Sequence, residues 1–337
     1  MSTIYQVAEV ANVSPKTAAR ILSGASKRSK HKDRVFAAAA KLGYVRNQQA
    51  ANLRSGSSQV IGIVVPGINN PTYGQIIQAM HDACLKEGFS ILLSCSFGNP
   101  DDELRALQTL QTYRADGVML NSSELSASPQ ALELCQRMLD AGKPVIFSGV
   151  SEPGIPADMI GLHNEAAVAK AVRYLIAKGH RRIGFVGGRR ETEAMKQRHA
   201  GYVKALAEAG LEVPGDFSLF SDGSLPSVSK QVTRVMLQYP PAERPTAFVS
   251  GNDLLAIAAM RAIHQLSLKI PEQVAIVGFD DIDLAEILTP ALTTLRQPQE
   301  QMALDCTKLM IERIRSKDVS SPQKLMYEPE LVIRDSA

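Results

Sequence analysis

Residues 3–24, TIYQVAEVANVSPKTAARILSG, predict two short helices joined by a tight turn. The first helix starts where Thr3 and Gln6 have the spacing of a capping box, in which the two side chains satisfy free backbone amides. The second starts at Ser14 and Pro15, because serine is a favoured N-cap and proline fits the first helical position. Two short helices joined by a turn of a few residues are the plan of a helix-turn-helix.

The turn and a third helix complete a small all-α head. Asn12 suits the left-handed backbone of the turn, a conformation that asparagine tolerates. The second helix is expected from Pro15 to about Ser23, with Gly24 as its stop, and a third over residues 30–42. The apolar side chains spaced to form one core are Ala8, Val13, Ala18, Ile21, Val35, Ala38, Ala39 and Leu42.

The outer face of the second helix carries Lys16, Thr17 and Arg20. In a helix-turn-helix this helix enters the major groove of DNA. Arginine can donate two hydrogen bonds to guanine, and lysine and threonine can contact bases or phosphates. The alternative is an ordinary solvated helix face, but the capped helix pair, the third helix and the local charge together favour DNA.

Charge is unevenly distributed along the 337 residues. Residues 1–60 contain ten Lys and Arg against two Asp and Glu, a net charge of +8, whereas the other 277 residues contain 27 against 32, a net −5. The total of +3 therefore hides a basic head that precedes a mildly acidic body. Such asymmetry indicates a polyanion as the partner of the head.

Residues 47–58, NQQAANLRSGSS, form a short helical pattern that leads into a Ser/Gly linker. A helix of two turns is marginal alone in water, since isolated helices need roughly 12–15 residues. We expect this hinge to fold only where DNA and a partner hinge support it. The predicted domains are a helix-turn-helix head of residues 1–46, a hinge of residues 47–58 and a body of residues 59–337.

The body alternates apolar strands with helical segments in two successive series. Strands are expected at residues 59–66, 89–96, 116–123, 144–150 and 159–162, and then at 181–188, 217–222, 245–251 and 274–280. Helices are expected between them, in the first series at residues 72–87, 101–114 and 129–141. This pattern indicates two α/β halves with Rossmann-like parallel sheets covered on both faces. A ligand cleft is expected between them, at the carboxyl ends of the strands.

Polar side chains follow several of these strands, where the cleft is expected. They are Asn69, Asn70, Tyr73, His163, Asn164, Asn252, Asp253, Asp280, Asp281 and Asp283, with Arg198 in the helix after residues 181–188. Carboxylates, amides and a guanidinium make directed hydrogen bonds to hydroxyl groups, and a tyrosine ring covers an apolar ring face. The alternative is that such side chains cap helices, which is the favoured interpretation for Asn164 and Asn252.

Residues 3–24 resemble the N-terminus of the lactose-repressor/galactose-repressor (LacI/GalR) family of bacterial transcription regulators. The resemblance continues through RVFAAAAKLGYVRNQQAANLRSGSSQVIGIVVP (residues 34–66) and covers essentially the whole chain. The sequence departs from the family at Ala18 and Ala19, where Val-Ser is usual, and at Pro15, which has no side chain that contacts bases. These differences concern the operator sequence and not the class of activity.

The resemblance implies a sequence-specific repressor whose body has the sugar-binding fold of periplasmic binding proteins. The operator contacts it implies are Ser14, Lys16, Thr17, Arg20, Ser29, Asn47, Ala50 and Leu53. Leu53 matches a leucine that the family wedges into the minor groove at the operator centre, and such wedges kink DNA. The effector contacts it implies are Tyr73, His163, Arg198, Asn252, Asp253 and Asp280. A palindromic operator implies a homodimer or a tetramer.

Two positions of the expected cleft lack a carboxylate that the family often has. His163 stands where Asp is frequent, and Gly149 falls near another frequent Asp. The loss of two carboxylates beside Arg198 favours an effector that is anionic or less rich in hydroxyl groups, so the candidates are a sugar, a sugar acid and a sugar phosphate. Whether the effector induces or co-represses does not follow from the sequence.

Several other classes are disfavoured. The four cysteines are Cys84, Cys95, Cys135 and Cys306. They lie far apart, without a CxxC pair or clustered histidines, so buried thiols are expected rather than disulfides or zinc ligands. GFVGG at residues 184–188 is not a GxGxxG loop, and the acidic run at residues 280–283 has no histidine partner, so no cofactor or metal is expected. No nucleophile elbow or acid–base pair is found, and we predict that the chain is not an enzyme.

The sequence also bears on location. The first thirty residues contain no apolar run of signal-peptide type, and no stretch approaches the ~20 apolar residues that cross a bilayer, so we expect a cytoplasmic protein without membrane contact. The alternative function is a solute-binding protein of a sugar transporter, which shares the body fold but needs a signal peptide and has no use for residues 1–58. The sequence therefore predicts a DNA-binding repressor controlled by a small-molecule effector.

Overall fold

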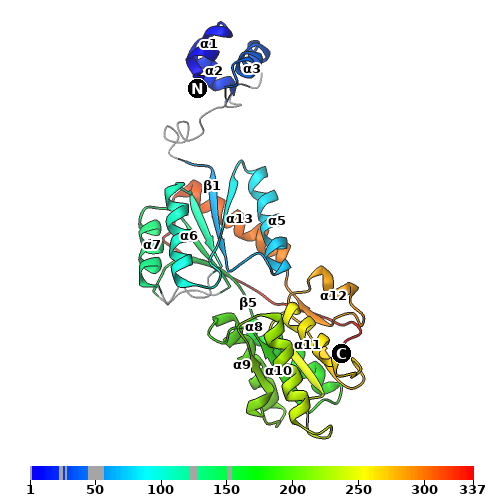
Figure 1. Cartoon of the computed structure of the whole chain (residues 1–337). Coiled ribbons are helices and arrows are strands. Elements are labelled where there is room, and N and C mark those ends of the chain that lie inside the picture. The colour runs from blue at the N-terminus through cyan, green and yellow to red at the C-terminus, as the bar shows by residue number, and fades with distance from the viewer. Residues whose placement is uncertain (1, 23–25, 27–28, 45–56, 122–127, 150–153) are drawn as a thin grey trace. The chain divides into compact units, whose positions relative to one another are not determined.

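The computed structural model describes residues 2–22, 26, 29–44, 57–121, 128–149 and 154–337 (Figure 1). The chain forms two compact units, Met1–Ser58 and Gln59–Ala337. Apart from Ser57 and Ser58, the predicted hinge lies outside the described residues. The limits of the head and of the hinge therefore stay predictions.

The first unit contains three short helices, α1 (Ile4–Val10), α2 (Pro15–Leu22) and α3 (Lys32–Lys41). Their apolar faces meet in one small core. Its buried members are Val7, Ala8, Ala11, Ala18, Ile21, Val35, Ala38 and Ala39. Arg34 Nη2 donates a 2.6 Å hydrogen bond to the carbonyl oxygen of Ala11, and this bond ties α3 to the end of α1.

Local signals fix where these helices begin. Thr3 and Gln6 form the expected capping box at the start of α1. Asn12 has a φ of 49°, the left-handed conformation expected for the turn. Ser14 Oγ accepts a 3.1 Å hydrogen bond from the amide of Thr17, which caps α2. The helix-turn-helix geometry thus follows from residues that are close together in the sequence.

In the second unit, the first sheet has six parallel strands in the order β2, β1, β3, β4, β5, β11. The strands are β1 (Val60–Val65), β2 (Ser90–Cys95), β3 (Gly117–Leu120), β4 (Val145–Gly149), β5 (Asp158–Leu162) and β11 (Lys324–Tyr327). Helices α6 (Pro100–Thr112) and α7 (Pro129–Asp140) cover one face, and α5 (Pro71–Lys86) and α13 (Gln299–Ser316) cover the other (Figure 1). We call this sheet and its four helices the first subdomain.

The second sheet has four parallel strands in the order β7, β6, β8, β9. The strands are β6 (Ile183–Gly187), β7 (Ser218–Phe220), β8 (Ala247–Ser250) and β9 (Ala275–Val277). Helices α8 (Asn164–Ala177) and α9 (Glu193–Glu208) cover one face, and α10 (Leu225–Gln238) and α11 (Asp253–Gln265) cover the other. A 3₁₀ turn (Gly215–Phe217) precedes β7, and the short helix α12 (Asp283–Ile287) follows β9. This sheet and its helices are the second subdomain.

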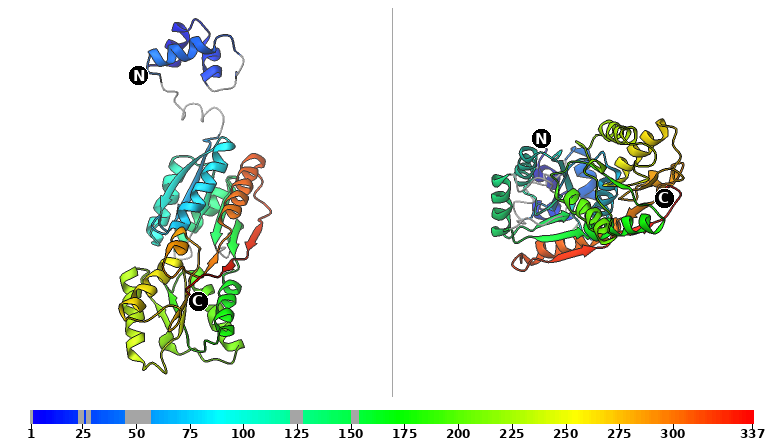
Figure 2. Two further views of the ribbon diagram at one scale, coloured as in Figure 1. Left: turned by 90° about the vertical axis from the view of Figure 1, so that its right-hand side faces the viewer. Right: turned by 90° about the horizontal axis from the view of Figure 1, so that it is seen from below.

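The chain passes between the two subdomains three times (Figure 2). It leaves the first sheet after β5, returns between β10 (Thr294–Arg296) and α13, and crosses again between β11 and β12 (Glu330–Val332). Strands β10 and β12 pair antiparallel with each other. The two subdomains are therefore joined by three adjacent segments and not by a single linker.

The C-terminal part departs from the expected two successive series, because α13 and β11 return to the first sheet. Arg313 of α13 donates two hydrogen bonds of 2.9 Å to the carboxylate of Asp158 in β5. The amide of Gln323, 165 residues from Asp158, donates a 2.7 Å bond to the same carboxylate. No local pattern indicates so distant a pairing.

The predicted class, an all-α head with an α/β body of two parallel sheets, is confirmed.

Candidate functional site

The outer face of α2 presents basic side chains from a capped helix. Lys16 and Arg20 are exposed, and Thr17 is half-buried. Ser14 Oγ and Thr17 Oγ1 lie 2.8 Å apart and share a hydrogen bond. Because side chains four residues apart are neighbours on a helix, Lys16 and Arg20 project from the same face. This face can contact a polyanion without rearrangement of the cap.

The other predicted DNA contacts are placed only in part. Ser29 is half-buried before α3, where its Oγ accepts a 3.3 Å hydrogen bond from the amide of His31. Asn47, Ala50 and Leu53 lie outside the described residues. The DNA contacts of these residues and of α2 stay predictions.

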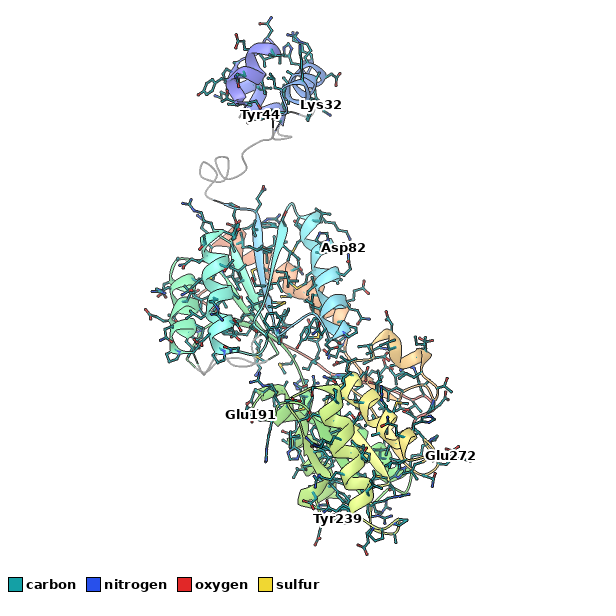
Figure 3. All side chains as sticks on the ribbon, viewed as in Figure 1. Lys32, Tyr44, Asp82, Glu191, Tyr239 and Glu272 are labelled. Carbon is teal, nitrogen blue, oxygen red and sulfur yellow. The ribbon has the colours of Figure 1, made fainter. Side chains whose placement is uncertain are left out.

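A cavity of about 520 Å³ lies between the two subdomains. The first subdomain lines it with residues at the ends of its strands or just beyond them, including Pro66, Asn69, Asn70, Tyr73, Phe97, Gly98, Asn121, Ser148 and Gly149. The second subdomain and the crossing segment contribute Asn164, Arg189, Thr192, Glu193, Arg198, Asp222, Asn252, Asp280 and Gln297. Figure 3 shows Glu191, in the loop before α9, on the side of the second subdomain that faces the first. The cavity lies where open α/β sheets bind ligands, beyond the carboxyl ends of the strands.

Arg198 of α9 is held rigidly in the wall of this cleft. Its Nε donates a 2.9 Å hydrogen bond to Asn164 Oδ1, and its Nη1 donates to the carbonyl oxygen of Gly251. The guanidinium carbon lies 3.5 Å from the centre of the Phe279 ring. Burial lowers the pKa of Arg198 from its usual value, and the charge of Asp280 opposes this. The result is a fixed donor group.

Asp280 supplies acceptor oxygens to the same cleft and is only 3% exposed. Its Oδ1 accepts a 2.6 Å hydrogen bond from Gln297 Nε2, and its Oδ2 accepts a 3.1 Å bond from Asn70 Nδ2. Burial raises the pKa of Asp280, whereas Arg198 and these hydrogen bonds lower it. Each carboxylate oxygen has a second lone pair, so Asp280 can still accept from a ligand hydroxyl.

Tyr73 places an aromatic ring beside these two groups. It lies in the first turn of α5, where Asn70 caps the helix by accepting a 3.2 Å hydrogen bond from the amide of Thr72. Burial, and then the negative charge of Asp280, raise the pKa of Tyr73 to about 12. The phenol therefore stays protonated at neutral pH, and its ring can cover an apolar ligand face.

The two asparagines expected as helix caps behave differently. Asn252 lines the cleft and also caps α11, because its Oδ1 accepts a 2.9 Å hydrogen bond from the amide of Leu255. Asn164 is not the cap of α8, whose cap position is His163. Its side chain instead accepts from Arg198 and donates a 3.2 Å bond to Gln197 Oε1. Asn164 thus orients the guanidinium in the cleft.

Two predicted effector contacts do not line this cavity. Asp253 is fully buried, and its carboxylate accepts from the amide of Ile282 at 2.9 Å and from Thr294 Oγ1 at 2.5 Å. Burial, and then the charge of Asp280, raise the pKa of Asp253 to about 7. His163 lines a separate cavity of about 460 Å³, together with Glu165, Ala166, Arg173, Gln197 and Lys204. The structure therefore brings together Tyr73, Arg198, Asn252 and Asp280.

Sequence reasoning missed several lining residues. Arg189 and Glu193 follow β6, and Asp222 follows β7, so the rule that ligands bind beyond strand ends could have indicated them. Arg189 Nη1 donates a 2.5 Å hydrogen bond to the carbonyl oxygen of Gly98 in the other subdomain. Gln297 has no local signal, because a crossing segment brings it to Asp280.

The lining is polar and nearly balanced in charge. It contains two guanidinium groups, on Arg189 and Arg198, and three carboxylates, on Glu193, Asp222 and Asp280. Within the part of the chain that the structure describes, no group of three His, Cys, Asp or Glu side chains could hold a metal ion. None of the described helices is both long and apolar enough to cross a membrane. Fixed donors, fixed acceptors and the aromatic rings of Tyr73 and Phe97 are suited to binding a hydroxylated small molecule.

Two family descriptions match the chain. Residues 3–47 match "Bacterial regulatory proteins, lacI family", and residues 172–337 match "Periplasmic binding protein-like domain". The first match covers all three described head helices, and the second covers the C-terminal part of α8 and all later elements.

Characterised relatives match over the whole length of the chain. The HTH-type transcriptional repressor PurR of Aliivibrio salmonicida (strain LFI1238) is 30% identical over 339 residues, which are 100% of this chain and 99% of the relative. The ribose operon repressor of Escherichia coli (strain K12) is 29% identical over 346 residues, with 100% of both chains covered.

Solved structures show the same architecture. The lac repressor dimer bound to operator and the anti-inducer ONPF is similar with a TM-score of 0.83 and 26% identity, over 99% of this chain and 98% of that one. The complex of the transcriptional regulator CelR with cellobiose is similar with a TM-score of 0.72 and 27% identity, over 100% of both chains.

Proposed function

Because the chain belongs to the lacI family of bacterial regulatory proteins, we propose that it is a sequence-specific DNA-binding transcriptional repressor controlled by a small-molecule effector. One observation carries this function: the chain combines a basic, capped helix-turn-helix with a body that holds a polar cleft between two α/β subdomains. A solute-binding protein has no use for the first unit. The relatives that match the whole chain are repressors and not enzymes.

The helix α2 is the element that we assign to the major groove of the operator. Lys16 and Arg20 project from its exposed face, and the cap at Ser14 fixes where that face begins. The lac repressor, similar over nearly the whole chain, was solved as a dimer on its operator. A homodimer places two such helices on the two halves of a palindromic site.

The effector that the cleft favours is a neutral, hydroxylated molecule such as a sugar. Arg198 offers donors, Asp280 offers acceptors, and the ring of Tyr73 lies beside them. The lining holds more carboxylates than guanidinium groups, which disfavours a sugar acid or a sugar phosphate. The argument for an anionic effector used His163 and Gly149, and of these only Gly149 lines the cleft, whereas His163 lines the separate cavity.

The DNA half of this function is tested by selection and titration. A pool of random duplexes selected on the full-length protein yields an operator, and its dissociation constant is then measured at several salt concentrations. We expect a palindromic consensus, and a logarithmic salt slope of about −0.9 for each neutralised phosphate. Binding that shows neither sequence selectivity nor salt dependence contradicts the assignment.

The effector half is tested by thermal unfolding in the presence of sugars, sugar acids, sugar phosphates and nucleosides. A compound at about 100 times its dissociation constant adds roughly 2.7 kcal/mol to the free energy of unfolding. Arg198→Met and Asp280→Asn should abolish the stabilisation. His163→Asp is the matched control and should keep it, because His163 does not line the cleft. A sugar phosphate that stabilises more than every neutral sugar would overturn the preference for a neutral ligand.

A further inference from the structure

The turn that carries Asp280 has an unusual backbone. Asp280 has a φ of 126° and Asp281 a φ of 60°, so two consecutive residues other than glycine have positive φ. Such conformations cost free energy and persist only where the surrounding structure fixes them. The groups that hold this turn therefore determine where the carboxylate of Asp280 lies.

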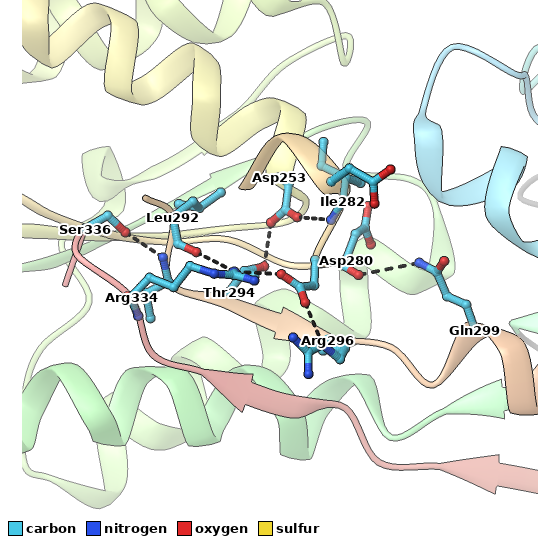
Figure 4. Close-up of polar contacts among 12 residues, drawn as sticks. Asp253, Asp280, Ile282, Leu292, Thr294, Arg296, Gln299, Arg334 and Ser336 are labelled. Carbon is cyan, nitrogen blue, oxygen red and sulfur yellow. Dashed lines mark hydrogen bonds and ion pairs between the residues drawn. The ribbon is translucent and has the colours of Figure 1, made fainter. Parts of the chain in front are cut away.

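Asp281 is held between two arginines that lie 15 and 53 residues further along the chain. Figure 4 labels these two arginines, Arg296 and Arg334. Its Oδ2 accepts a 2.6 Å hydrogen bond from Arg296 Nε, and its Oδ1 accepts a 2.7 Å bond from Arg334 Nη1. The Asp281 side chain is 8% exposed, and that of Arg334 is 14% exposed. Arg334 Nη1 also donates a 2.9 Å bond to the carbonyl oxygen of Leu292. We call Asp281, Arg296 and Arg334 the Asp281 clamp.

Asp253 holds the same turn from inside the second subdomain. Its carboxylate accepts from the amide of Ile282 and from Thr294 Oγ1, so it joins the turn to β10. Space at this point is tight, because a Cβ at Gly278 would lie 2.1 Å from Asp253 Oδ1. Thr294 and Arg296 both belong to β10, the strand that leads out of the second subdomain.

The turn also contacts the first subdomain. Asn70 Nδ2 donates a 3.1 Å hydrogen bond to Asp280, and Gln75 Nε2 of α5 donates a 3.0 Å bond to Asp283 Oδ1. The three aspartates of residues 280–283 thus accept hydrogen bonds from five side chains, those of Asn70, Gln75, Arg296, Gln297 and Arg334. The acidic run is a structural junction between the cleft, the crossing strand and helix α5.

From these contacts we propose that Asp281 is a positioning residue of the cleft: its two arginine partners hold the left-handed turn that presents Asp280, and so tie that carboxylate to β10. This role rests on the proposed effector site. A ligand that binds Asp280 then acts, through the clamp, on a strand that joins the two subdomains. Removal of the clamp loosens the turn, which Asp253 and the 2.9 Å hydrogen bond from the Asp280 amide to the Leu295 carbonyl oxygen still join to β10. The carboxylate of Asp280 then shifts relative to Gln297 and Arg198.

The test measures the position of Asp280 without DNA or effector. Full-length protein labelled with ¹³C at the aspartate carboxyl carbons is titrated by NMR, and the Asp280 resonance is assigned by its loss in Asp280→Asn. In the original protein we expect it to titrate above the ordinary aspartate pKa of about 3.9. In the double variant Arg296→Met/Arg334→Met we expect its pKa to move back toward that value, because the loss of burial, the largest cause of the raised pKa, outweighs the loss of its contacts with Gln297 and Arg198.

Amide hydrogen exchange of residues 278–284 is the second readout, and we expect it to become roughly tenfold faster or more in the double variant. In Arg296→Lys/Arg334→Lys, the pKa of Asp280 and the exchange rate of residues 278–284 should both stay close to those of the original protein. The matched control is Arg315→Met, which breaks the exposed 2.8 Å ion pair with Glu87 and should change neither. If the double variant does not fold, Asp281→Asn, which keeps both arginines and tolerates positive φ, takes its place.

Two outcomes overturn the proposal. One is an unchanged pKa of Asp280 and unchanged exchange in a folded clamp variant. The other is faster exchange with an unchanged pKa, because that result assigns the clamp to stability alone. Neither measurement uses a sugar or an operator, so failure of the repressor assignment and failure of the clamp assignment give different results.

Discussion

At the scale of single residues, similar side chains in similar sequence positions have different roles. Asp253 and Asp280 each lie just beyond a strand of the second sheet, yet only Asp280 lines the cleft. The difference comes from the turn at residues 280 and 281, whose positive φ values direct one carboxylate into the cavity while Asp253 is fully buried. Backbone conformation, and not residue type, decides which acid can contact a ligand.

Arg20 should recognise particular base pairs and not only phosphates. Replacement by alanine should cost about 1–3 kcal/mol at specific operator positions, because the fork of hydrogen bonds to guanine is lost. Arg20→Lys keeps the charge but cannot form that fork, and should lose most of the same selectivity. Binding to a set of singly substituted operators measures both. A uniform loss on every sequence would make Arg20 a phosphate contact.

Asp253 should make the stability of the body depend on pH. Its pKa is raised to about 7 in the folded chain, whereas the unfolded value is about 3.9. The folded state therefore holds the proton between these values, and the free energy of unfolding falls as pH rises, by at most about 1.4 kcal/mol per pH unit. The negative charges of Asp280 and Asp281 face the carboxyl group of Asp253 and also raise its pKa.

The measurement is urea unfolding from pH 4.5 to 8 for the original chain and for Asp253→Asn. The free energy of unfolding of the original chain minus that of Asp253→Asn should fall as pH rises to about pH 7 and then level off. A parallel pair of curves would show that Asp253 titrates at its ordinary value.

At the scale of elements, the helices are positioned by close approaches that the sequence does not reveal. Gly201 of α9 packs against the backbone of Glu165 in α8, and a Cβ at Gly201 would lie 2.1 Å from that carbonyl oxygen. Arg198 lies one turn before Gly201 in α9, and Asn164 is the residue next to Glu165 in α8. The spacing of α8 and α9 therefore sets the geometry of the cleft wall.

Gly201→Ala should destabilise the second subdomain, by about 1–3 kcal/mol, because the two helices must move apart. The matched control is Gly74→Ala in α5, where a Cβ meets nothing within 4 Å. There the substitution should stabilise by roughly 0.5–1 kcal/mol, as alanine favours a helix over glycine. Denaturant unfolding compares the two variants. Equal effects would show that the α8–α9 contact can relax.

At the scale of the whole molecule, the sequence predicts what is local and misses what is distant. Capping residues, strand periodicity and the left-handed Asn12 each depend on a few neighbouring residues, and the head and both sheets were predicted from them. The return of α13 and β11, the pairing of β10 with β12 and the contact of Gln297 with Asp280 depend on crossing segments. Four of the six predicted cleft residues line the cavity, because strand ends identify its edge but not the inward-facing side chains.

The ion pair between Asp158 and Arg313 fastens the returning segment to the first sheet. Both side chains are buried, at 4% and 8% exposure, and Arg313 also donates to the carbonyl oxygens of Asp318 and Ser321. Asp158→Ala should cost about 3–5 kcal/mol, since it leaves a buried cation unpaired. The double variant Asp158→Leu/Arg313→Met should cost less free energy of unfolding than the sum of the costs of Asp158→Leu and Arg313→Met. Arg315→Met, from an exposed pair, should cost under about 1 kcal/mol. Denaturant unfolding measures the cost of every one of these variants.

The return of β11 to the edge of the first sheet also sets an order of events on the ribosome. Strand β5 needs β11 as its outer neighbour, and the two are separated by the entire second subdomain. At roughly 5–20 residues per second, synthesis of the intervening chain takes about 10 to 30 s. Throughout that time the β5 edge is an unpaired template of the kind that promotes aggregation. The second subdomain can thus finish its sheet on the nascent chain before the first, although it is made later.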